Sequence, residues 1–286
     1  MVSRRDFLKI GCSSIGATAL ASFVPFDLTG LFPSKSLSIG FQVWTVREDL
    51  FKDLKGTLIR MAKMGYKQVE MCSPLGYSDS GFDVFNKMSG TEMRKIIEST
   101  GLVCHSSHFG FGEMRDSLEN RIEWSQQMGL TQMILSSFWL PENASIDDYK
   151  KACDELNKIA LKIKAAGMQT GFHNHNMEFV KKDNELIYDA IMSQLDPDLV
   201  KMQFQVAVIE VGYKAADYFR KYPGRFISSH LADWSNDKKK QVPIGQGVVD
   251  WKDFFEAAKI GGVQNFFVEM APENFPDSAK FLAKMK

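Results

Sequence analysis

The sequence has no excess of charge of either sign, because 35 lysines and arginines balance 35 aspartates and glutamates. Proteins that bind nucleic acids usually carry a basic excess, which this chain lacks. No Gly-x-Gly-x-x-Gly follows the first apolar run, and no Gly-x-Ser-x-Gly occurs. These absences argue against nucleic-acid binding, a dinucleotide-binding fold and covalent acyl chemistry. An enzyme that acts on small molecules remains compatible with the composition.

Long apolar runs are also missing, since a stable membrane span needs roughly 20 apolar residues. The short run "IGCSSIGATALASF" follows a charged start, "SRRDFLK", and contains an Ala-x-Ala pattern ending at Ala21. This order is typical of an export signal, and Arg4 and Arg5 resemble a twin-arginine signal. We expect residues 1–35 to be a twin-arginine-type signal peptide and linker, an ordinary amphipathic helix being the alternative. The mature protein would then be periplasmic or otherwise extracytoplasmic, without a membrane span.

Cysteine is scarce and scattered. Cys12 lies in the predicted signal, which leaves Cys72, Cys104 and Cys153 in the rest of the chain. An odd, dispersed set does not predict a disulfide framework.

From Ser36 onwards, short apolar runs alternate with amphipathic helical patterns. The apolar runs are "LSIGFQVW", "YKQVEM", "LVCHSSH", "QMILSS", "MQTGFHNH", "LVKMQFQ", "RFISSH" and "NFFVEM". Several helical patterns end at glycines such as Gly65 and Gly129, and glycine adopts the left-handed conformation that ends helices at little cost. Eight strands alternating with helices predict a parallel (β/α)8 TIM barrel over residues 36–286. A doubly wound open sheet is the alternative.

In such a barrel, functional residues lie at the carboxyl ends of the strands. All five histidines of the chain fall at predicted strand ends. The polar residues at these ends are Glu70, His105, Ser107, His108, Ser136, Ser137, His173, Asn174, His175, Gln203, Gln205, His230 and Glu269. Because an unpaired buried imidazole or amide costs a few kcal/mol, we expect them to line an open polar mouth. Strand alternation places His173 and His175 on one face and Asn174 on the other.

Imidazole and carboxylate groups that converge from the fifth, seventh and eighth strands indicate a divalent metal site. Histidine suits zinc, manganese, cobalt or iron, and two histidines with one carboxylate form a recurrent catalytic arrangement. Individual histidines packed in the core are the alternative.

Longer motifs in the same order resemble a known family. They are "IGFQVWTVREDLFKDLKGTLIRMAKMGYKQVE", "GFHNHNMEF", "KYPGRFISSHLADW", "VPIGQGVVDWKDFFEAAK" and "FFVEM". From about Leu37 to the C-terminus, the chain resembles the sugar phosphate isomerase/epimerase family with the xylose isomerase-like barrel. The resemblance implies a metal held by Glu, Asp, His and Glu from four strands. His230 and Glu269 match the last two, whereas His173 and Gln205 replace the first Glu and the Asp.

The resemblance therefore implies a divalent ion (Mn, Zn, Co or Mg) bound by His230, Glu269, His173 and Gln205. It also implies proton abstraction beside a carbonyl, with Glu269 as the base and His173 and His175 as alternatives. The residues expected to contact the substrate are Glu70, His108, Asn174, Glu178, Gln203 and Asp233. No Gly-rich phosphate cradle supports the word phosphate in the family name.

The function expected from these residues is a metal-dependent isomerase or epimerase that acts on a sugar, an inositol or a keto-sugar. A lyase or hydrolase of 3-keto-glycosides on the same barrel is one alternative. A non-catalytic sugar-binding barrel is another, because Gln205 removes a carboxylate from the metal site. A nuclease on this fold is disfavoured by the neutral charge. The expected partner is a small carbohydrate, and homo-oligomerisation stays open.

Overall fold

The computed structural model describes residues 38–285. The predicted signal peptide and linker, residues 1–35, and Cys12 within them lie outside the described residues. Within 38–285, none of the helices combines the length and the apolar character needed to cross a membrane.

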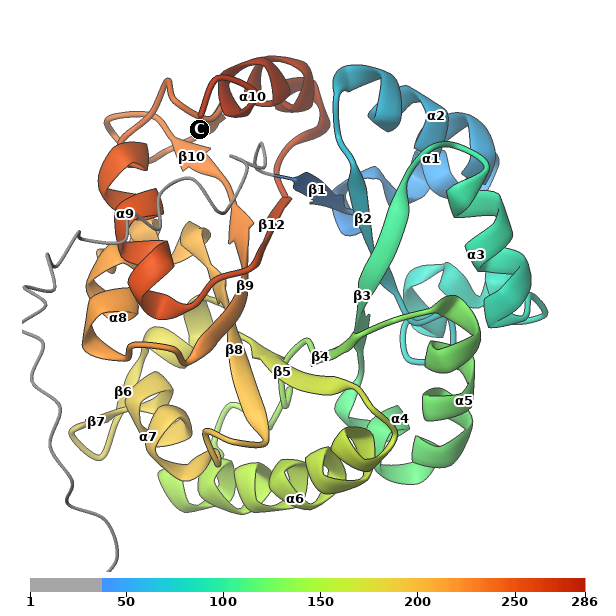
Figure 1. Ribbon diagram of the computed structural model, residues 1–286. Helices are drawn as coiled ribbons and strands as arrows, with labels where there is room; N and C mark the ends of the chain where they lie inside the picture. Colours follow the sequence, from blue (N-terminus) through green and yellow to red (C-terminus); the bar gives the residue numbers. More distant parts are fainter. Residues whose placement is uncertain (1–37, 286) are drawn as a thin grey trace, which may run out of the picture. The chain divides into compact units, whose positions relative to one another are not determined.

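Eight parallel strands close into a barrel (Figure 1). They are β1 (Ile39–Gln42), β2 (Gln68–Cys72), β3 (Val103–Phe109), β4 (Gln132–Leu135), β5 (Gln169–His173), β8 (Val200–Gln205), β9 (Phe226–Leu231) and β12 (Asn265–Val268). Each strand pairs with the next in chain order, and the ring closes where Ile39 of β1 pairs with Phe266 of β12. The predicted TIM barrel is confirmed, and the open doubly wound sheet is wrong.

The α-helices form a ring around the barrel (Figure 1). They are α1 (Arg47–Lys52), α2 (Leu54–Met64), α3 (Gly90–Glu98), α4 (Phe111–Asp116), α5 (Leu118–Met128), α6 (Ile146–Ala165), α7 (Ile187–Gln194), α8 (Ala215–Lys221), α9 (Trp251–Gly261) and α10 (Phe275–Leu282). Local sequence sets their ends. Ser145 caps α6 by accepting the N–H of Asp148, and α5 ends at Gly129 with φ of 75°, a conformation that suits glycine.

The connections between strands and helices contain short strands and 3-10 turns. Two small antiparallel hairpins pair β6 (Lys181–Lys182) with β7 (Glu185–Leu186) and β10 (Asp233–Trp234) with β11 (Gln241–Val242). The 3-10 turns are η3 (Trp44–Val46), η4 (Ser78–Ser80), η5 (Phe82–Phe85), η6 (Asn176–Phe179), η7 (Val206–Val211) and η8 (Pro272–Asn274).

The barrel strands are buried on both faces, as a parallel sheet covered by helices requires. In β9, for example, Ser228, Ser229 and His230 are all fully buried. His105 departs from this pattern. The pairing of β2 with β3 shifts register between Gln68 and Glu70, and His105, in the first half of β3, is exposed. The expectation that all five histidines end strands is therefore wrong for His105.

Asp233 holds the long loop between β9 and α9. Its buried carboxylate accepts hydrogen bonds from the backbone N–H groups of Trp234, Gly245, Gly247 and Val249 and from the indole of Trp251, at 2.9–3.1 Å. Every recorded bond of this carboxylate goes to the loop or to the start of α9. The arrangement argues against the predicted substrate contact and gives Asp233 a structural role.

Replacing Asp233 with asparagine should destabilise the fold. In the unchanged protein, five N–H groups donate to the two charged oxygens of Asp233. Asparagine has one acceptor oxygen and no charge. Hydrogen bonds to charged groups contribute about 1.5–3 kcal/mol each. We expect a loss of about 2–3 kcal/mol in the free energy of unfolding, measured by urea denaturation. Asp237→Asn, in the exposed part of the same loop, is the control. Equal stability of the two variants would contradict this role.

Candidate active site

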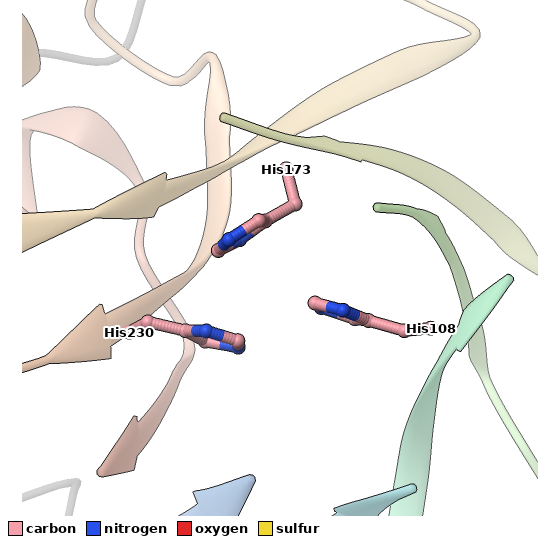
Figure 2. Close-up of side chains that lie close together, drawn as sticks. All are labelled: His108, His173 and His230. Atoms are coloured by element: carbon pink, nitrogen blue, oxygen red, sulfur yellow. The ribbon is translucent and has the colours of Figure 1, made fainter. Parts of the chain in front are cut away.

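Three buried histidines from three strands point toward one another inside the barrel (Figure 2). They are His108 of β3, His173 of β5 and His230 of β9. One potential ligand atom of each lies within 4.8 Å of those of the other two. The rings of His108 and His230 are stacked, with centroids 5.1 Å apart and planes inclined by 7°. This three-histidine group could bind a metal ion.

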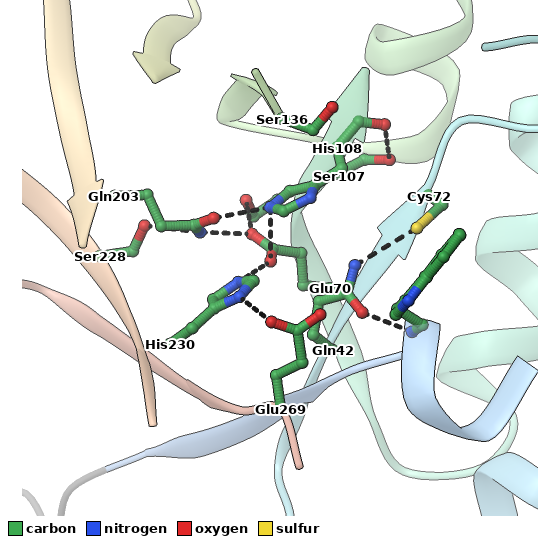
Figure 3. A network of polar contacts seen from close by, with 12 residues as sticks. Gln42, Glu70, Cys72, Ser107, His108, Ser136, Gln203, Ser228, His230 and Glu269 are labelled. Atoms are coloured by element: carbon green, nitrogen blue, oxygen red, sulfur yellow. Dashed lines mark hydrogen bonds and ion pairs between the residues drawn. The ribbon is translucent and has the colours of Figure 1, made fainter. Parts of the chain in front are cut away.

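His230 links two carboxylates (Figure 3). Its Nε2 lies 2.5 Å from Glu70 Oε2, and its Nδ1 lies 2.9 Å from Glu269 Oε2. Burial alone would lower the pKa of His230, but the two carboxylates outweigh burial and raise it to about 9. Burial would likewise raise the pKa of Glu70 and of Glu269, yet neighbouring histidines, His230 among them, hold both below the usual value. At neutral pH, His230 is therefore an imidazolium shared by two carboxylates.

Gln203 extends this network to His108. Its Nε2 donates to Glu70 Oε1 at 2.8 Å and to Ser228 Oγ at 2.9 Å, while its Oε1 lies 2.6 Å from His108 Nε2. Ser106 Oγ donates to the same oxygen of Glu70 at 2.6 Å. Gln203 thus fixes Glu70 and His108 relative to each other. In this structure, both residues serve the interior network, and their predicted contact with a substrate stays a prediction.

Gln205 presents its amide nitrogen, not its oxygen, to Glu269. The Nε2 donates to Glu269 Oε2 at 2.6 Å, and the Oε1 accepts the N–H of Ala207 at 3.3 Å. Of the ligands implied by the family resemblance, His173 and His230 belong to the three-histidine group. Glu269 contacts this group through His230 and accepts a hydrogen bond from Gln205. The third member is His108, which the sequence had assigned to the substrate.

The donor set of this group fits a divalent ion. Imidazole nitrogens with neighbouring carboxylates suit zinc and similar metals, and Nδ1 of His173 is buried without a hydrogen-bond partner. Burial lowers the pKa of His173, so its ring is neutral and can donate a lone pair. Two nitrogens on one zinc ion at about 2.1 Å cannot lie more than about 4.2 Å apart. The three rings would therefore have to close slightly, and His230 would have to release a proton.

A cavity of about 240 Å³ opens above this network. Its lining residues are Gln42, Trp44, Tyr77, His108, Ser136, Trp139, His173, His175 and Glu269. The rings of His173 and His175 lie 4.8 Å apart, as expected for residues on one strand face. Burial lowers the pKa of His175 to about 4, so this imidazole is neutral at pH 7. The cavity therefore brings two neutral histidines and the Glu269 carboxylate to one space.

Sequence reasoning missed part of this lining. Gln42 ends β1, and the strand-end criterion applied elsewhere could have found it. Its Nε2 donates to Cys72 Sγ at 3.3 Å, and its Oε1 accepts the N–H of Trp44. Trp44, Tyr77 and Trp139 lie in connections that follow β1, β2 and β4. No spacing in the sequence marks these three aromatic residues.

Glu178 is fully buried and accepts two hydrogen bonds. Its Oε1 accepts one from the hydroxyl of Ser137 at 2.7 Å, and its Oε2 accepts one from the backbone N–H of His175 at 2.6 Å. Burial raises the pKa of Glu178 to about 7. Asn174 has a comparable part, since its Oδ1 accepts the N–H of Gln205 at 3.2 Å and joins β5 to β8. Both side chains support the site from behind, and their predicted substrate contacts stay predictions.

Comparison with known proteins identifies the family. A family model described as a xylose isomerase-like TIM barrel matches residues 58–285. The chain belongs to the xylose isomerase-like TIM barrel family. A sugar phosphate isomerase/epimerase from Parabacteroides distasonis has a similar structure, with a TM-score of 0.74 and 21% identity over 88% of this chain and 97% of that one.

Two further proteins are similar to this chain. The structure of the IOLI protein with a bound zinc atom is similar, with a TM-score of 0.63 and 14% identity over 87% of this chain and 94% of that one. The sequence of inosose dehydratase from Clostridium perfringens is 28% identical over 97 residues, which are 34% of this chain and 32% of that protein. The match thus spans about a third of the curated relative. Family membership accordingly rests on the family model, and the two solved structures show the fold.

Replacing His173 with alanine should remove most of the bound metal without unfolding the protein. Nδ1 of His173 has no hydrogen-bond partner, and the buried carboxylates pair with His108 and His230 instead. Removal of the His173 ring therefore leaves no buried carboxylate without its partner. We expect at least about a tenfold lower zinc content by elemental analysis after dialysis against zinc-buffered solution. His175→Ala, which removes the neighbouring imidazole outside the three-histidine group, should retain the metal. Equal loss in both variants would place the ion elsewhere.

Glu178→Gln should reduce the pH dependence of stability. A carboxyl whose pKa rises from 4.5 to about 7 on folding stabilises the fold below pH 4.5, and this contribution is lost as the pH rises through 7. Glutamine imitates the protonated acid and does not titrate. From pH 5 to pH 8, the variant should gain on the order of 2–3 kcal/mol relative to the unchanged protein. Urea denaturation with a chelator present measures this, and Glu142→Gln, at an exposed site, is the control. Parallel pH profiles would refute the assignment.

Proposed function

We propose that this protein is a sugar isomerase or epimerase that removes a proton from the carbon beside a carbonyl group. The observation that carries the proposal is the meeting of Glu269, His173 and His175 at one small cavity. Their pKa values are all lowered, by nearby histidines for Glu269 and chiefly by burial for the two histidines. The cavity therefore offers an ionised carboxylate and neutral imidazoles at neutral pH, which are the forms that accept protons.

Glu269 is the proposed base. Both of its recorded hydrogen bonds, from His230 and Gln205, use Oε2, so Oε1 is the oxygen available to a substrate proton. The Gln205 amide and the His230 ring, both in contact with Oε2, fix the plane of the carboxylate. A base that is oriented and charged before substrate arrives needs little reorganisation during proton transfer.

The histidines would act on the substrate oxygens, whereas Glu269 acts on the carbon-bound proton. His175 is neutral, and a neutral imidazole can donate a hydrogen bond to the substrate oxygen or accept a hydroxyl proton. A divalent ion held by His108, His173 and His230 would stabilise negative charge that develops on substrate oxygens. Isomerisation needs one group that takes a proton from one carbon and returns it to the next. Glu269 is the proposed group for both steps, because its hydrogen bonds use Oε2 and leave Oε1 available.

An elimination reaction is the second candidate. The local similarity to an inosose dehydratase favours it, since loss of water beside a carbonyl begins with the same proton abstraction. A 3-keto-glycoside lyase or hydrolase would share that step, with a different leaving group. The non-catalytic sugar-binding barrel remains the alternative without chemistry. An extracytoplasmic location stays a proposal that depends on Arg4 and Arg5, outside the described residues.

The proposal predicts exchange of a substrate proton with solvent. In deuterium oxide, the protein should incorporate deuterium beside the carbonyl of at least one sugar in a panel of ketoses and inososes, detected by NMR. Glu269→Gln should slow this exchange by about 100-fold or more, as loss of a general base does. Glu273→Gln, an exposed neighbour, should exchange at the original rate.

Two other results would be decisive. Exchange at the original rate in Glu269→Gln, with metal content unchanged, would show that another group is the base. Failure of the unchanged, metal-loaded protein to exchange any sugar in the panel would rule out the isomerase and the elimination reaction together. Binding of a sugar without exchange would then leave the non-catalytic barrel.

A further inference from the structure

Glu70 is fully buried, and the proposed reaction gives it no part. Its Oε1 accepts hydrogen bonds from Ser106 Oγ at 2.6 Å and from Gln203 Nε2 at 2.8 Å. Its Oε2 lies 2.5 Å from His230 Nε2 and 3.2 Å from His108 Nε2 (Figure 3). Each oxygen of this carboxylate therefore has two partners, and both partners of Oε2 belong to the three-histidine group.

The contacts of Gln203 determine which nitrogen of His108 carries the proton. An ionised carboxylate only accepts hydrogen bonds, so Gln203 turns its NH2 group toward Glu70 and its carbonyl oxygen toward His108. The carbonyl oxygen is also an acceptor only, and it lies 2.6 Å from His108 Nε2. Nε2 is therefore an N–H group, and the neutral ring has its lone pair on Nδ1. Because His108 lines the cavity, Nδ1 is its nitrogen available to a ligand.

His230 lies between a fully buried carboxylate and one at the cavity. Its Nε2 faces Glu70, and its Nδ1 lies 2.9 Å from Glu269 Oε2. A metal ion that binds one nitrogen of His230 must displace one of these carboxylates. Loss of its partner is costly for a buried charge such as Glu70, whereas Glu269 lines the cavity, where its side chain is 15% exposed. The lone pair for the ion is therefore on Nδ1, and Nε2 keeps its proton for Glu70.

We propose that Glu70 is the positioning residue of the metal site. Its carboxylate keeps Nε2 protonated in both His108 and His230, so that each ring offers Nδ1 to a divalent ion. A carboxylate that accepts the second N–H of a metal-bound histidine fixes the tautomer and the orientation of the ring. Here one carboxylate serves two rings, which are stacked with centroids 5.1 Å apart. This role differs from the substrate contact predicted for Glu70, and it rests on the ion of the proposed function but not on the proton abstraction.

Glu70→Gln is the decisive variant, because glutamine has the shape of the acid but its NH2 group can only donate. Ser106 and Gln203 both donate to Oε1, so the carbonyl oxygen should take that place and the NH2 group should face the two histidines. Nε2 of His108 and of His230 would then have to accept. We expect both Nε2 signals in nitrogen-15 NMR spectra to change from protonated to unprotonated nitrogen. Zinc should bind about 10- to 100-fold more weakly in a competition titration.

Glu113→Gln is the matched control. Glu113 is also a buried carboxyl, and it accepts hydrogen bonds from the hydroxyl of Ser73 at 2.7 Å and from the N–H of Gly110 at 2.8 Å. Neither partner belongs to the three-histidine group, so the same substitution should leave the two Nε2 signals and the zinc affinity unchanged. The comparison separates a role toward the ion from a general effect of losing a buried acid.

A second measurement needs no variant and decides the question even if Glu70→Gln does not fold. In the unchanged protein loaded with cadmium-113, the metal should couple to Nδ1, and not to Nε2, of His108 and His230. Coupling to Nε2 of either ring would overturn the inference. So would Nε2 that stays protonated in Glu70→Gln, zinc affinity that is unchanged there or equally reduced in both variants, or an unchanged protein that binds neither metal. Metal binding as expected without deuterium exchange into any sugar would overturn the proposed function alone.

Discussion

The interior of this barrel depends on the ion-paired His230. Carboxylates buried in a protein are costly unless they are paired and hydrogen-bonded, and Glu70 is fully buried while Glu269 is largely so. His230 satisfies one oxygen of each, and Gln203 extends the pairing to His108. Strands β2, β3, β8, β9 and the end of β12 are thereby joined through side chains across the barrel. A divalent ion and a proton must compete for His230, because both of its nitrogens are already engaged.

The site divides into an inner part that is polar and an outer part that is aromatic. The inner residues are largely committed to one another, which fixes their geometry and their protonation. In the outer part, Trp139 is exposed, and its backbone N–H donates to Ser137, whose hydroxyl donates to Glu178. Gln205 belongs to the inner part, because its amide orients Glu269 by a hydrogen bond.

The sequence predicted the barrel, because eight apolar runs alternate with helical patterns and closure follows from that rhythm. It also brought His173, His175, His230 and Glu269 together, because each lies at a strand end. The part of His108 in the three-histidine group was missed, since contacts across a barrel depend on the register of strands distant in sequence. His105 was misplaced because a register shift in β3 is not visible in the residue pattern. The role of Asp233 and the position of Trp139 at the cavity depend on loop conformation, which neither periodicity nor composition determines.

The pairing of Glu70 with His230 has a consequence for how the chain folds. The two residues are 160 positions apart, and the partner on the other side of His230, Glu269, lies close to the C-terminus. Contacts of such long sequence separation form late and slow the folding of a domain. A chain that lacks β9 contains Glu70 without His230, which pairs with it in the complete barrel. The network around His230 is thus completed only when strands from both halves of the chain have come together.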